Sequence, residues 1–298
     1  MKSSALALIN PGGGTAARDA EVGGTVSAVL RAAGVDADVQ VVPGDELVER
    51  AEQAAKAGVQ LVIAGGGDGT MSAVAGALGG TGTAMGILPL GTLNHLARDL
   101  GIPADLDRAA EVIAAGHRRR IDLAEVNGRT FVNNSAIGLY PMMVVDRDHQ
   151  QRRLGRSKRL AMIVASLRTL ARFHDHRLTL TADEGQGTLD TPLLFIGNND
   201  YRLALPAAGH RDALDDGHLC VLVMRKKGIP GFLAATARAL IGRARDDDMV
   251  QLDAVEHLRV DSRRTHLTVA IDGETCSMKT PLDYRIRKGA LTVVAPGG

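Results

Sequence analysis

Residues 61–70 read Leu-Val-Ile-Ala-Gly-Gly-Gly-Asp-Gly-Thr, from Leu61 to Thr70, and this stretch decides the fold. An apolar run of strand length stops at three glycines, an acid and a fourth glycine, and Met71–Leu78 then has the composition of a helix. Glycines allow positive φ and a close approach of the backbone, and a helix N-terminus attracts anions. Strand, glycine turn and helix therefore predict a phosphate-binding turn; a tight strand-to-helix connection is the plainer interpretation.

Asp68 distinguishes this turn from a plain dinucleotide-binding loop. A carboxylate repels a polyanion unless a cation lies between them, so Asp68 indicates Mg²⁺ or an ordered polar network. Two standard phosphate motifs are excluded. A Walker loop requires Gly-Lys-Ser/Thr, and no lysine follows these glycines, whereas the dinucleotide pattern requires its third glycine at another spacing.

The composition limits the partners and the compartment. The 298 residues carry a net charge of +1, aromatic residues make up 2% of the chain, and tryptophan is missing. Because nucleic-acid binding usually needs a basic field or stacking aromatics, no nucleic-acid partner is expected.

Cys220 and Cys276 lie in apolar segments and indicate reduced thiols, as in a cytoplasm. The apolar run Ala5–Ile9 is too short for a signal peptide, and no stretch has the roughly 18 apolar residues that span a bilayer, so a soluble or peripheral protein is expected.

The first part of the chain alternates strands with helices. Strands are predicted over four apolar segments: Ala5–Ile9, Val35–Val42, Gln60–Ala64 and Ala84–Leu88. Further helices are predicted over about Asp19–Ala33, from a cap at Asp45 to Lys56, and from a cap at Asp105 to Ala115. This alternation predicts a parallel sheet, whose ligands bind at the carboxyl ends of the strands. Three turns follow strand ends, and we expect them to share one crevice: Asn10–Thr15, Gly65–Thr70 and Pro89–Asn94.

The pattern changes after about Glu125. Three arginines, Arg118–Arg120, indicate a solvent-exposed face before a strand, and Asn127-Gly128 predicts a hairpin turn. Short β-like runs then follow, separated by acidic glycine turns: Arg129–Val132, Leu178–Thr181, Leu193–Ile196, Leu219–Val223, Val250–Leu252, His266–Ile271, Arg285–Ile286 and Leu291–Val294. We predict an α/β domain over residues 1–125 and a mainly antiparallel β domain over residues 126–298.

Two helices are predicted inside the β domain, near Arg156–Phe173 and Gly231–Arg243. The segment Gln151–Arg177 contains eight basic residues and one acid, Asp175. A basic amphipathic helix can lie on anionic lipid. An ordinary helix packed on the sheet, with a charged outer face, is the alternative interpretation.

Two acidic turns are candidates for chemistry. Leu214–Leu219 contains Asp215 and Asp216, and paired acids with nearby carbonyls can hold a hard cation. Asp272-Gly273-Glu274 follows an apolar strand, and a carboxylate there can take a proton from an attacking hydroxyl. By spacing alone, both segments also fit plain hairpin turns.

Taken in order, these segments resemble the catalytic family of diacylglycerol kinases, in its soluble bacterial lipid-kinase branch. The matching stretches extend over nearly the whole chain: Asn10–Gly13, Gly66–Thr70, Leu88–Asn94 with Ala97-Arg98, Ile121–Leu123, Asn133–Gly138, Leu214–Leu219 and Ile271–Glu274. The resemblance implies an N-terminal α/β domain like that of phosphofructokinases and NAD kinases, a C-terminal β domain and an ATP cleft between them. It also implies that the last strand returns to the first domain.

The resemblance assigns roles to individual residues. Catalytic roles fall to Glu274, the favoured base, to Asp272, a close second, and to Asp68. ATP-contacting positions are Asn10, Pro11, Gly12, Gly13, Gly14, Gly66, Gly67, Asp68, Gly69, Thr70, Met71, Ser72, Thr92 and Asn94. By position, Asp216 resembles a ligand of a structural Mg²⁺, which the carbonyls of Ala213 and His218 would also bind. Asp122 resembles an acid that supports this metal network. His95 departs from the family pattern, which often has Asp there.

The expected activity is thus the transfer of a phosphoryl group from ATP, with Mg²⁺, to a lipid hydroxyl. The simplest acceptor is diacylglycerol, which would give phosphatidic acid. The expected partner is a lipid at the membrane surface, reached by peripheral contact from the cytoplasm; a homodimer stays open. Two alternatives remain. A sibling kinase acting on NAD would share the Gly66–Gly69 turn, but Thr92, Asn94 and the Asp272–Glu274 turn speak against it. A non-catalytic lipid or nucleotide binder would have less reason to retain Asp68, Asp272 and Glu274.

Overall fold

The structure is a computed structural model that describes residues 5–11, 21–138, 175–183, 185–204, 209–226, 228–245 and 247–297. The predicted basic helix and Gly12–Gly14 lie outside these ranges. Within them the chain forms two compact units. The first comprises the described residues of Met1–Leu123, Ala213–Asp215 and Arg287–Gly298, and the second those of Ala124–Asp212 and Asp216–Ile286. The sequence places its domain boundary at residues 125 and 126.

The first unit is built on a parallel sheet. Its strands are β1 (Ala5–Ile9), β2 (Ala37–Val41), β3 (Leu61–Gly66) and β4 (Ala84–Pro89), in the order β2-β1-β3-β4. The end of β16 (Leu282–Val294) joins β4 in parallel, with Thr292 opposite Ala84 and Val293 opposite Met85. This architecture confirms the predicted α/β fold of the N-terminal part.

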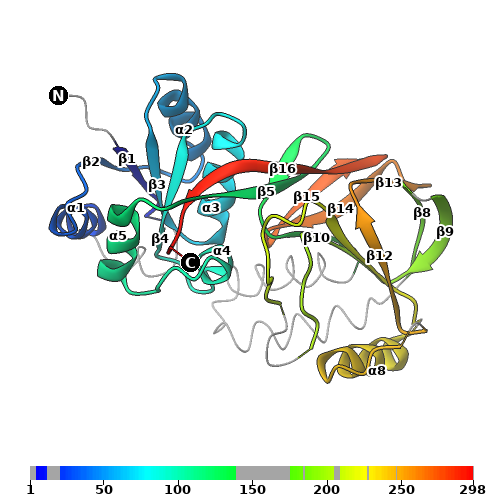
Figure 1. The fold of residues 1–298 in the computed structure, drawn as a ribbon. Coiled ribbons are helices and arrows are strands. Elements are labelled where there is room, and N and C mark those ends of the chain that lie inside the picture. The colour runs from blue at the N-terminus through cyan, green and yellow to red at the C-terminus, as the bar shows by residue number, and fades with distance from the viewer. Residues whose placement is uncertain are drawn as a thin grey trace, which may run out of the picture. The chain divides into compact units, whose positions relative to one another are not determined.

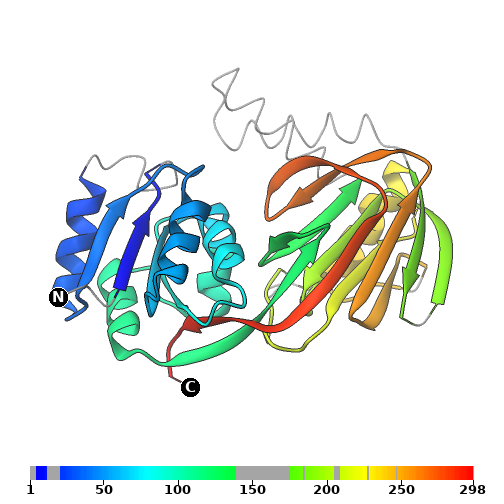
Figure 2. The ribbon, with the colours of Figure 1, turned by 90° about the horizontal axis from the view of Figure 1, so that it is seen from above.

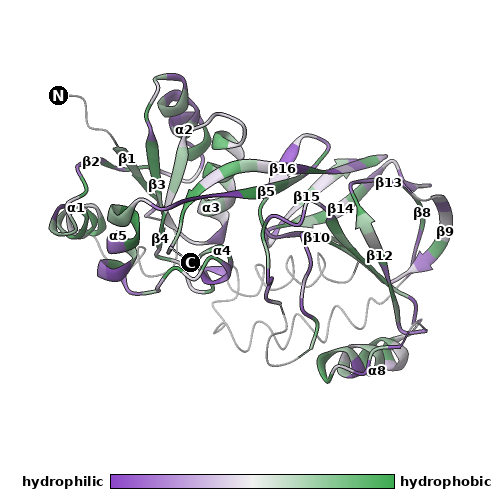
Figure 3. Ribbon diagram, viewed as in Figure 1, coloured by the Kyte–Doolittle hydropathy of each residue, from purple (hydrophilic) through white to green (hydrophobic). Residues whose placement is uncertain are grey.

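Helices flank this sheet (Figures 1 and 2). They are α1 (Val22–Ala32), α2 (Leu47–Lys56), α3 (Asp68–Leu78), α4 (His95–Asp99) and α5 (Leu106–Ala115). Helix α2 packs against α3, and α1 against α5. The apolar residues of α2, at positions 47, 51 and 54, recur at helical spacing and are buried, while its polar face is purple in Figure 3.

One predicted cap is present and one is wrong. The Asp105 carboxylate accepts a hydrogen bond from Arg108 N at 3.0 Å and caps α5. Asp45 does not cap α2, because the chain makes a turn, with Glu46 N donating to Pro43 O, and the helix begins later, at Leu47. The N-cap residue is Glu46, whose side chain makes no capping hydrogen bond.

The second unit is mainly antiparallel β structure, as predicted, and its strands belong to two sheets. One sheet has the order β12-β11-β10-β7-β14-β15, and in the other β16 is followed by β13, β8 and β9. The strands are β5 (Arg118–Val126), β6 (Arg129–Phe131), β7 (Asn134–Gly138), β8 (His176–Ala182), β9 (Gly185–Thr191), β10 (Leu193–Asn198), β11 (Leu219–Met224), β12 (Met249–Val255), β13 (His257–Ser262), β14 (His266–Ile271) and β15 (Glu274–Lys279). Buried apolar side chains of both sheets, with Phe131 and Tyr284 the largest, form its core.

Some strands differ from the prediction. Strands β7, β9, β13 and β15 were not expected, and the two segments predicted over Arg285–Ile286 and Leu291–Val294 are one strand, β16. The second predicted helix is α8 (Ile229–Leu240). Among the helices that the structure describes, none is long and apolar enough to span a bilayer.

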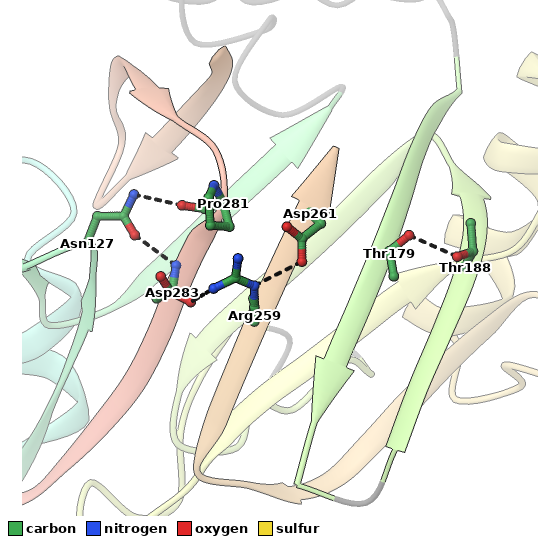
Figure 4. A network of polar contacts seen from close by, with 7 residues as sticks. All are labelled: Asn127, Thr179, Thr188, Arg259, Asp261, Pro281 and Asp283. Atoms are coloured by element: carbon green, nitrogen blue, oxygen red, sulfur yellow. Dashed lines mark hydrogen bonds and ion pairs between the residues drawn. The ribbon is translucent and has the colours of Figure 1, made fainter. Parts of the chain in front are cut away.

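Side chains on the outer faces connect neighbouring strands (Figure 4). Asn127 and Gly128 have positive φ, 47° and 80°, and form the predicted hairpin turn between β5 and β6. Asn127 Nδ2 donates to Pro281 O at 3.2 Å, and its Oδ1 accepts from Asp283 N at 2.8 Å, so this turn is fixed to β16. Arg259 on β13 contacts Asp261 and, at 3.5 Å, Asp283.

A buried ion pair fixes α8, and it makes stability depend on pH. Arg238 donates to both oxygens of Asp248, and this holds the pKa of the Asp248 carboxyl below its ordinary value of 3.8. Because the folded-state pKa is the lower one, the stabilisation is present above pH 3.8 and is lost as the pH falls through the folded-state value. Asp248→Asn should lower Tm at pH 7, and the difference from wild type should close below pH 3.8. Exposed Asp247→Asn is the control; a difference that stays constant down to pH 3 would contradict this role.

Candidate functional site

Three strand ends of the first unit lie abreast. Ile9 of β1 pairs with Gly65 of β3, and Gly66 of β3 pairs with Pro89 of β4. Hydrogen bonds continue past the strands, from Asn10 N to Gly65 O at 2.9 Å and from Leu90 N to Gly66 O at 3.1 Å. The turns that follow these strands therefore meet at one edge of the sheet, as the alternation of strands and helices predicts.

Two glycines let these turns approach each other. A Cβ on Gly91 would lie 2.5 Å from Gly67 Cα and 2.5 Å from Asn94 Oδ1, so any larger residue at position 91 would displace one of the turns. Gly67 is the N-cap of α3 and has no side chain to cover the first amides of the helix. A helix N-terminus reached by bare glycine backbone is suited to bind a phosphate group.

Asp68 takes part in an ordered polar network, one of the two interpretations that the sequence leaves open. Its Oδ1 accepts a hydrogen bond from His95 N, the first residue of α4, at 2.7 Å. Asn94 has a left-handed backbone with φ 49°, and its side chain accepts from Gly91 N and donates to Pro89 O. Asn94 therefore holds the turn after β4 in its own shape, and Asp68 fixes that turn to the one after β3.

The side chains at this edge have different roles. Thr70 is buried, and its Oγ1 accepts a hydrogen bond from Asn10 Nδ2 at 3.0 Å. Met71 is buried, whereas Pro11 and Thr92 are exposed. His95 Nδ1 lies 3.0 Å from the Arg98 guanidinium; because a guanidinium only donates, Nδ1 is the acceptor there. The structure thus brings together the predicted ATP-contacting positions of α3, β3 and the two described turns, while Gly12–Gly14 lie outside the described residues.

Asp272 is held by backbone amides in the second unit. It forms the hairpin turn between β14 and β15 with Gly273, where both residues have positive φ, 47° and 82°. Its carboxylate accepts three hydrogen bonds: Oδ2 from Val132 N at 2.8 Å, and Oδ1 from Asn133 N at 2.8 Å and Asn134 N at 3.0 Å. Asp272 N also donates to Asn134 O at 2.9 Å. The turn is thereby fixed to the segment between β6 and β7.

Glu274 has a different environment. It begins β15, opposite Ile271, and 67% of its side chain is exposed. Its Oε2 lies 3.3 Å from Nη2 of Arg129. Arg129 is on β6, the strand that directly precedes the amides that hold Asp272. An exposed carboxylate keeps lone pairs accessible to a substrate, whereas three of the lone pairs of Asp272 are used by the backbone. By this geometry Glu274 suits a proton acceptor and Asp272 suits a fixed anion.

The acidic turn at residues 214–219 is held by Asn199. Asn199 is buried with φ 64°, its N donates to His218 O at 3.1 Å, and its Oδ1 accepts from Gly217 N at 3.2 Å. His218 Nε2 lies 3.1 Å from Asp200 Oδ2. Asp215 binds Arg119 at 2.8 Å, and Asp216, the carboxylate predicted to bind a cation, is exposed on the same turn.

The donors of this turn fit Mg²⁺ chemically. An exposed carboxylate and backbone carbonyls are hard oxygen donors, and Mg²⁺ commonly binds through one or two carboxylates while keeping several waters. Asp122 is 2% exposed; its Oδ1 accepts from Gly289 N at 2.6 Å, and its N donates to Leu214 O at 2.7 Å. In the described ranges, no group of three or more His, Cys, Asp and Glu side chains is arranged to hold a metal. A cation at Asp216 would therefore depend on carbonyls and water.

Sequence reasoning missed a buried polar cluster beside Asp272. Asn133, Asn198 and Arg211 are each 4% exposed or less, and Arg211 donates to Val132 O at 2.7 Å and to Asn133 Oδ1 at 3.0 Å. The pairs Asn133-Asn134 and Asn198-Asn199 stand next to strands, and such polar repeats at strand ends were the available signal. No sequence pattern indicated Arg211.

A cavity of about 520 Å³ opens in the second unit between the β8–β9 hairpin and the paired strands β11 and β12. Apolar side chains form much of its wall: Leu180, Leu189, Val223, Met224, Leu252 and Val255. Asp183, Asp190 and Arg225 add charged groups to its lining. Such a cavity suits a ligand with a hydrocarbon part and a polar end.

Both parts of the chain match known protein families. Residues 4–126 match the diacylglycerol kinase catalytic domain, and residues 142–295 match the YegS C-terminal NAD kinase beta sandwich-like domain. A probable lipid kinase YegS-like from Citrobacter koseri is 44% identical over 115 residues, 37% of this chain and 38% of that protein. The probable lipid kinase YegS of Escherichia coli O127:H6 is 46% identical over 116 residues, with the same coverage. The matched stretch thus spans about two fifths of these relatives.

Solved structures share the fold over the full length. A diacylglycerol kinase from Bacillus anthracis superimposes with a TM-score of 0.72 at 21% identity, covering 99% of this chain and 98% of that one. A second B. anthracis structure gives a TM-score of 0.76 at 24% identity, covering 99% and 97%. Because the C-terminal model matches more than half of the chain, residues 142–295, and the catalytic model matches residues 4–126, this chain belongs to the diacylglycerol kinase catalytic-domain family, in the branch that carries a YegS-type C-terminal domain.

Proposed function

We propose that this protein is an ATP- and Mg²⁺-dependent lipid kinase that transfers the γ-phosphoryl group to a lipid hydroxyl. Diacylglycerol is the favoured acceptor, and phosphatidic acid the product. The observation that carries the proposal is the edge where the Gly67 turn and α3 meet the Gly91 turn, since bare amides at a helix N-terminus fit the phosphates of a nucleotide. The names of the relatives support lipid as the acceptor class.

In this mechanism the chain positions groups and stabilises charge. The amides of Gly67–Thr70 would bind phosphate oxygens, Asp68 would keep the two turns in register, and Asn94 would shape the turn after β4. Mg²⁺, when bound, neutralises charge on the phosphates. Glu274 accepts the proton of the lipid hydroxyl, and Asp272 fixes the turn that carries Glu274. The apolar cavity between β8–β9 and β11–β12 supports an acceptor with a hydrocarbon part.

The direct test is a transfer assay with γ-labelled ATP and a panel of acceptors. Diacylglycerol, monoacylglycerol, a sphingoid base, a prenol and NAD are each offered, with the lipids in mixed micelles. Label should appear in a lipid product, with diacylglycerol the best acceptor. Label in NAD alone would favour the sibling kinase. Absence of transfer to every acceptor, in single turnover and with Mg²⁺ present, would contradict an enzymatic function and favour a binder.

The proposed cation at Asp216 gives a second test. If the turn at residues 214–219 holds Mg²⁺, removing the ion with a chelator should lower the Tm of the wild type, because an ion bound to the folded state stabilises that state. Asp216→Ala should have a lower Tm and should not respond to the chelator. Asp215→Ala, on the same turn but paired with Arg119, is the matched control and should still respond. A wild-type melting curve that is indifferent to chelator would remove this cation from the mechanism.

A further inference from the structure

The backbone that holds Asp272 is held from its other side by Arg211. Val132 O accepts a hydrogen bond from Arg211 Nη1 at 2.7 Å and from Asn198 Nδ2 at 2.9 Å. Val132 C=O and Asn133 N–H belong to the same peptide group, and this N–H donates to Asp272 Oδ1 at 2.8 Å. A single peptide group therefore connects the guanidinium to the carboxylate.

A second path runs beside the first. Asn198 N donates to Asn133 O at 2.8 Å, and the next amide in that peptide group, Asn134 N–H, donates to Asp272 Oδ1 at 3.0 Å. Arg211 Nη2 also donates to Asn133 Oδ1 at 3.0 Å. Both paths point from donor to acceptor toward Asp272, and hydrogen bonds in such chains polarise one another. The amides that face the carboxylate are therefore stronger donors than isolated ones.

Arg211 is held in position by burial and by contact with an aromatic ring. It is 4% exposed, and its Cζ lies 5.4 Å from the centroid of the Tyr201 ring, which is close enough for a cation–π interaction. The Tyr201 ring packs edge-on against Phe195, with centroids 5.3 Å apart. It also lies over Gly197, where a Cβ would come within 2.7 Å of a ring carbon.

We propose that Arg211 is a positioning residue that acts through the peptide groups of Val132–Asn134 to hold the Asp272 carboxylate, and with it the β14–β15 turn that carries Glu274. Asn198 already supplies a neutral donor to Val132 O, so the distinct contribution of Arg211 is its permanent positive charge. The catalytic half of this inference rests on the proposed lipid kinase activity, and the structural half is independent of it.

The structural half is tested by amide hydrogen exchange on the full-length protein without ligand. In Arg211→Gln, which keeps a donor but loses the charge, exchange at residues 132–134 should be faster by about tenfold or more, as the loss of a charge-assisted hydrogen bond implies. Arg211→Lys should fall between Arg211→Gln and wild type. The control is Arg202→Gln, which removes an exposed ion pair with Asp212 and should leave these amides unchanged. If exchange at 132–134 in Arg211→Gln equals that of the wild type, the inference is wrong.

The catalytic half is tested by steady-state transfer to diacylglycerol. Arg211→Gln should lower kcat by about 10- to 100-fold, since a small displacement of a reacting group has effects of this size, while KM for ATP stays within about twofold. Arg211→Lys should restore part of kcat. In the Asp272→Asn background, Arg211→Gln should cause no further loss, because the group it positions is already changed.

The outcomes separate the two proposals. Fully additive losses in this double-mutant cycle would mean that Arg211 does not act through Asp272, and would overturn the inference. A wild type that transfers no phosphate to any lipid would overturn the proposed function, and the hydrogen-exchange result would then decide the structural half by itself.

Discussion

Glu274→Gln is expected to lower kcat for phosphate transfer by about 10²–10⁴-fold while KM for ATP stays near the wild-type value. The glutamine has nearly the same shape but cannot accept a proton from the lipid hydroxyl. Because Glu274 is 67% exposed and its contact with Arg129 lies at the surface, Tm should change little. The control is Glu52→Gln, which removes the surface ion pair between Glu52 and Lys56 on α2 and should leave kcat unchanged.

Asp272→Asn completes this experiment. An asparagine in its place presents an NH₂ group to backbone amides that also donate, so at least one of the three hydrogen bonds is lost. Both kcat and Tm should fall, whereas Glu274→Gln should reduce kcat alone. Full kcat in Glu274→Gln together with a large loss in Asp272→Asn would assign the base to Asp272. Full kcat in both variants would contradict a carboxylate base in this turn.

Asp68→Ala should lower activity by about 10²-fold or more, because the turn after β4 loses the group that fixes it to the turn after β3. Asp68→Asn separates the two functions of this side chain. Its amide oxygen can still accept the hydrogen bond from His95 N, so the turns should keep their register and Tm should stay near that of the wild type.

The comparison of the two variants tests for a cation. If Asp68 also supports Mg²⁺, Asp68→Asn should lose activity nearly as far as Asp68→Ala, and a higher Mg²⁺ concentration should recover part of it. Asp107→Ala, an acid in the first turn of α5, is the matched control. Wild-type turnover in Asp68→Ala at saturating ATP and Mg²⁺ would contradict the assignment of this turn.

The nucleotide edge could be predicted from the sequence because its rules are local. A strand that ends in glycines before a helix places its turn at the carboxyl end of a parallel sheet, and three such turns must then share an edge. Gly91 shows the limit of this reasoning. Its need for glycine comes from a contact with Gly67, 24 positions earlier, and that contact exists only once β3 and β4 are paired.

The β domain was harder to predict because tertiary contacts decide its strands and its polar groups. Strand β9 is largely exposed and polar, so apolar alternation is weak in it, whereas β13 alternates over only two buried apolar residues, Leu258 and Val260. The charged residues Arg287 and Lys288 interrupt the apolar pattern of β16, and the sequence therefore indicated two strands there. Arg211 and Asp272 both bind Val132–Asn134, about 80 and 140 positions away, and no local signal reports such a meeting.

The place of β16 constrains how the protein is made. Strand β4, at residues 84–89, acquires its parallel neighbour at residues 292–293, so the sheet of the first unit stays incomplete until β16 has been synthesised. Until residues 282–294 leave the ribosome, one edge of β4 offers unpaired backbone groups that another chain could bind. Nascent chains stalled before residue 282 should therefore depend on chaperones, and a nonsense mutation just before residue 282 should affect the first unit as much as the second.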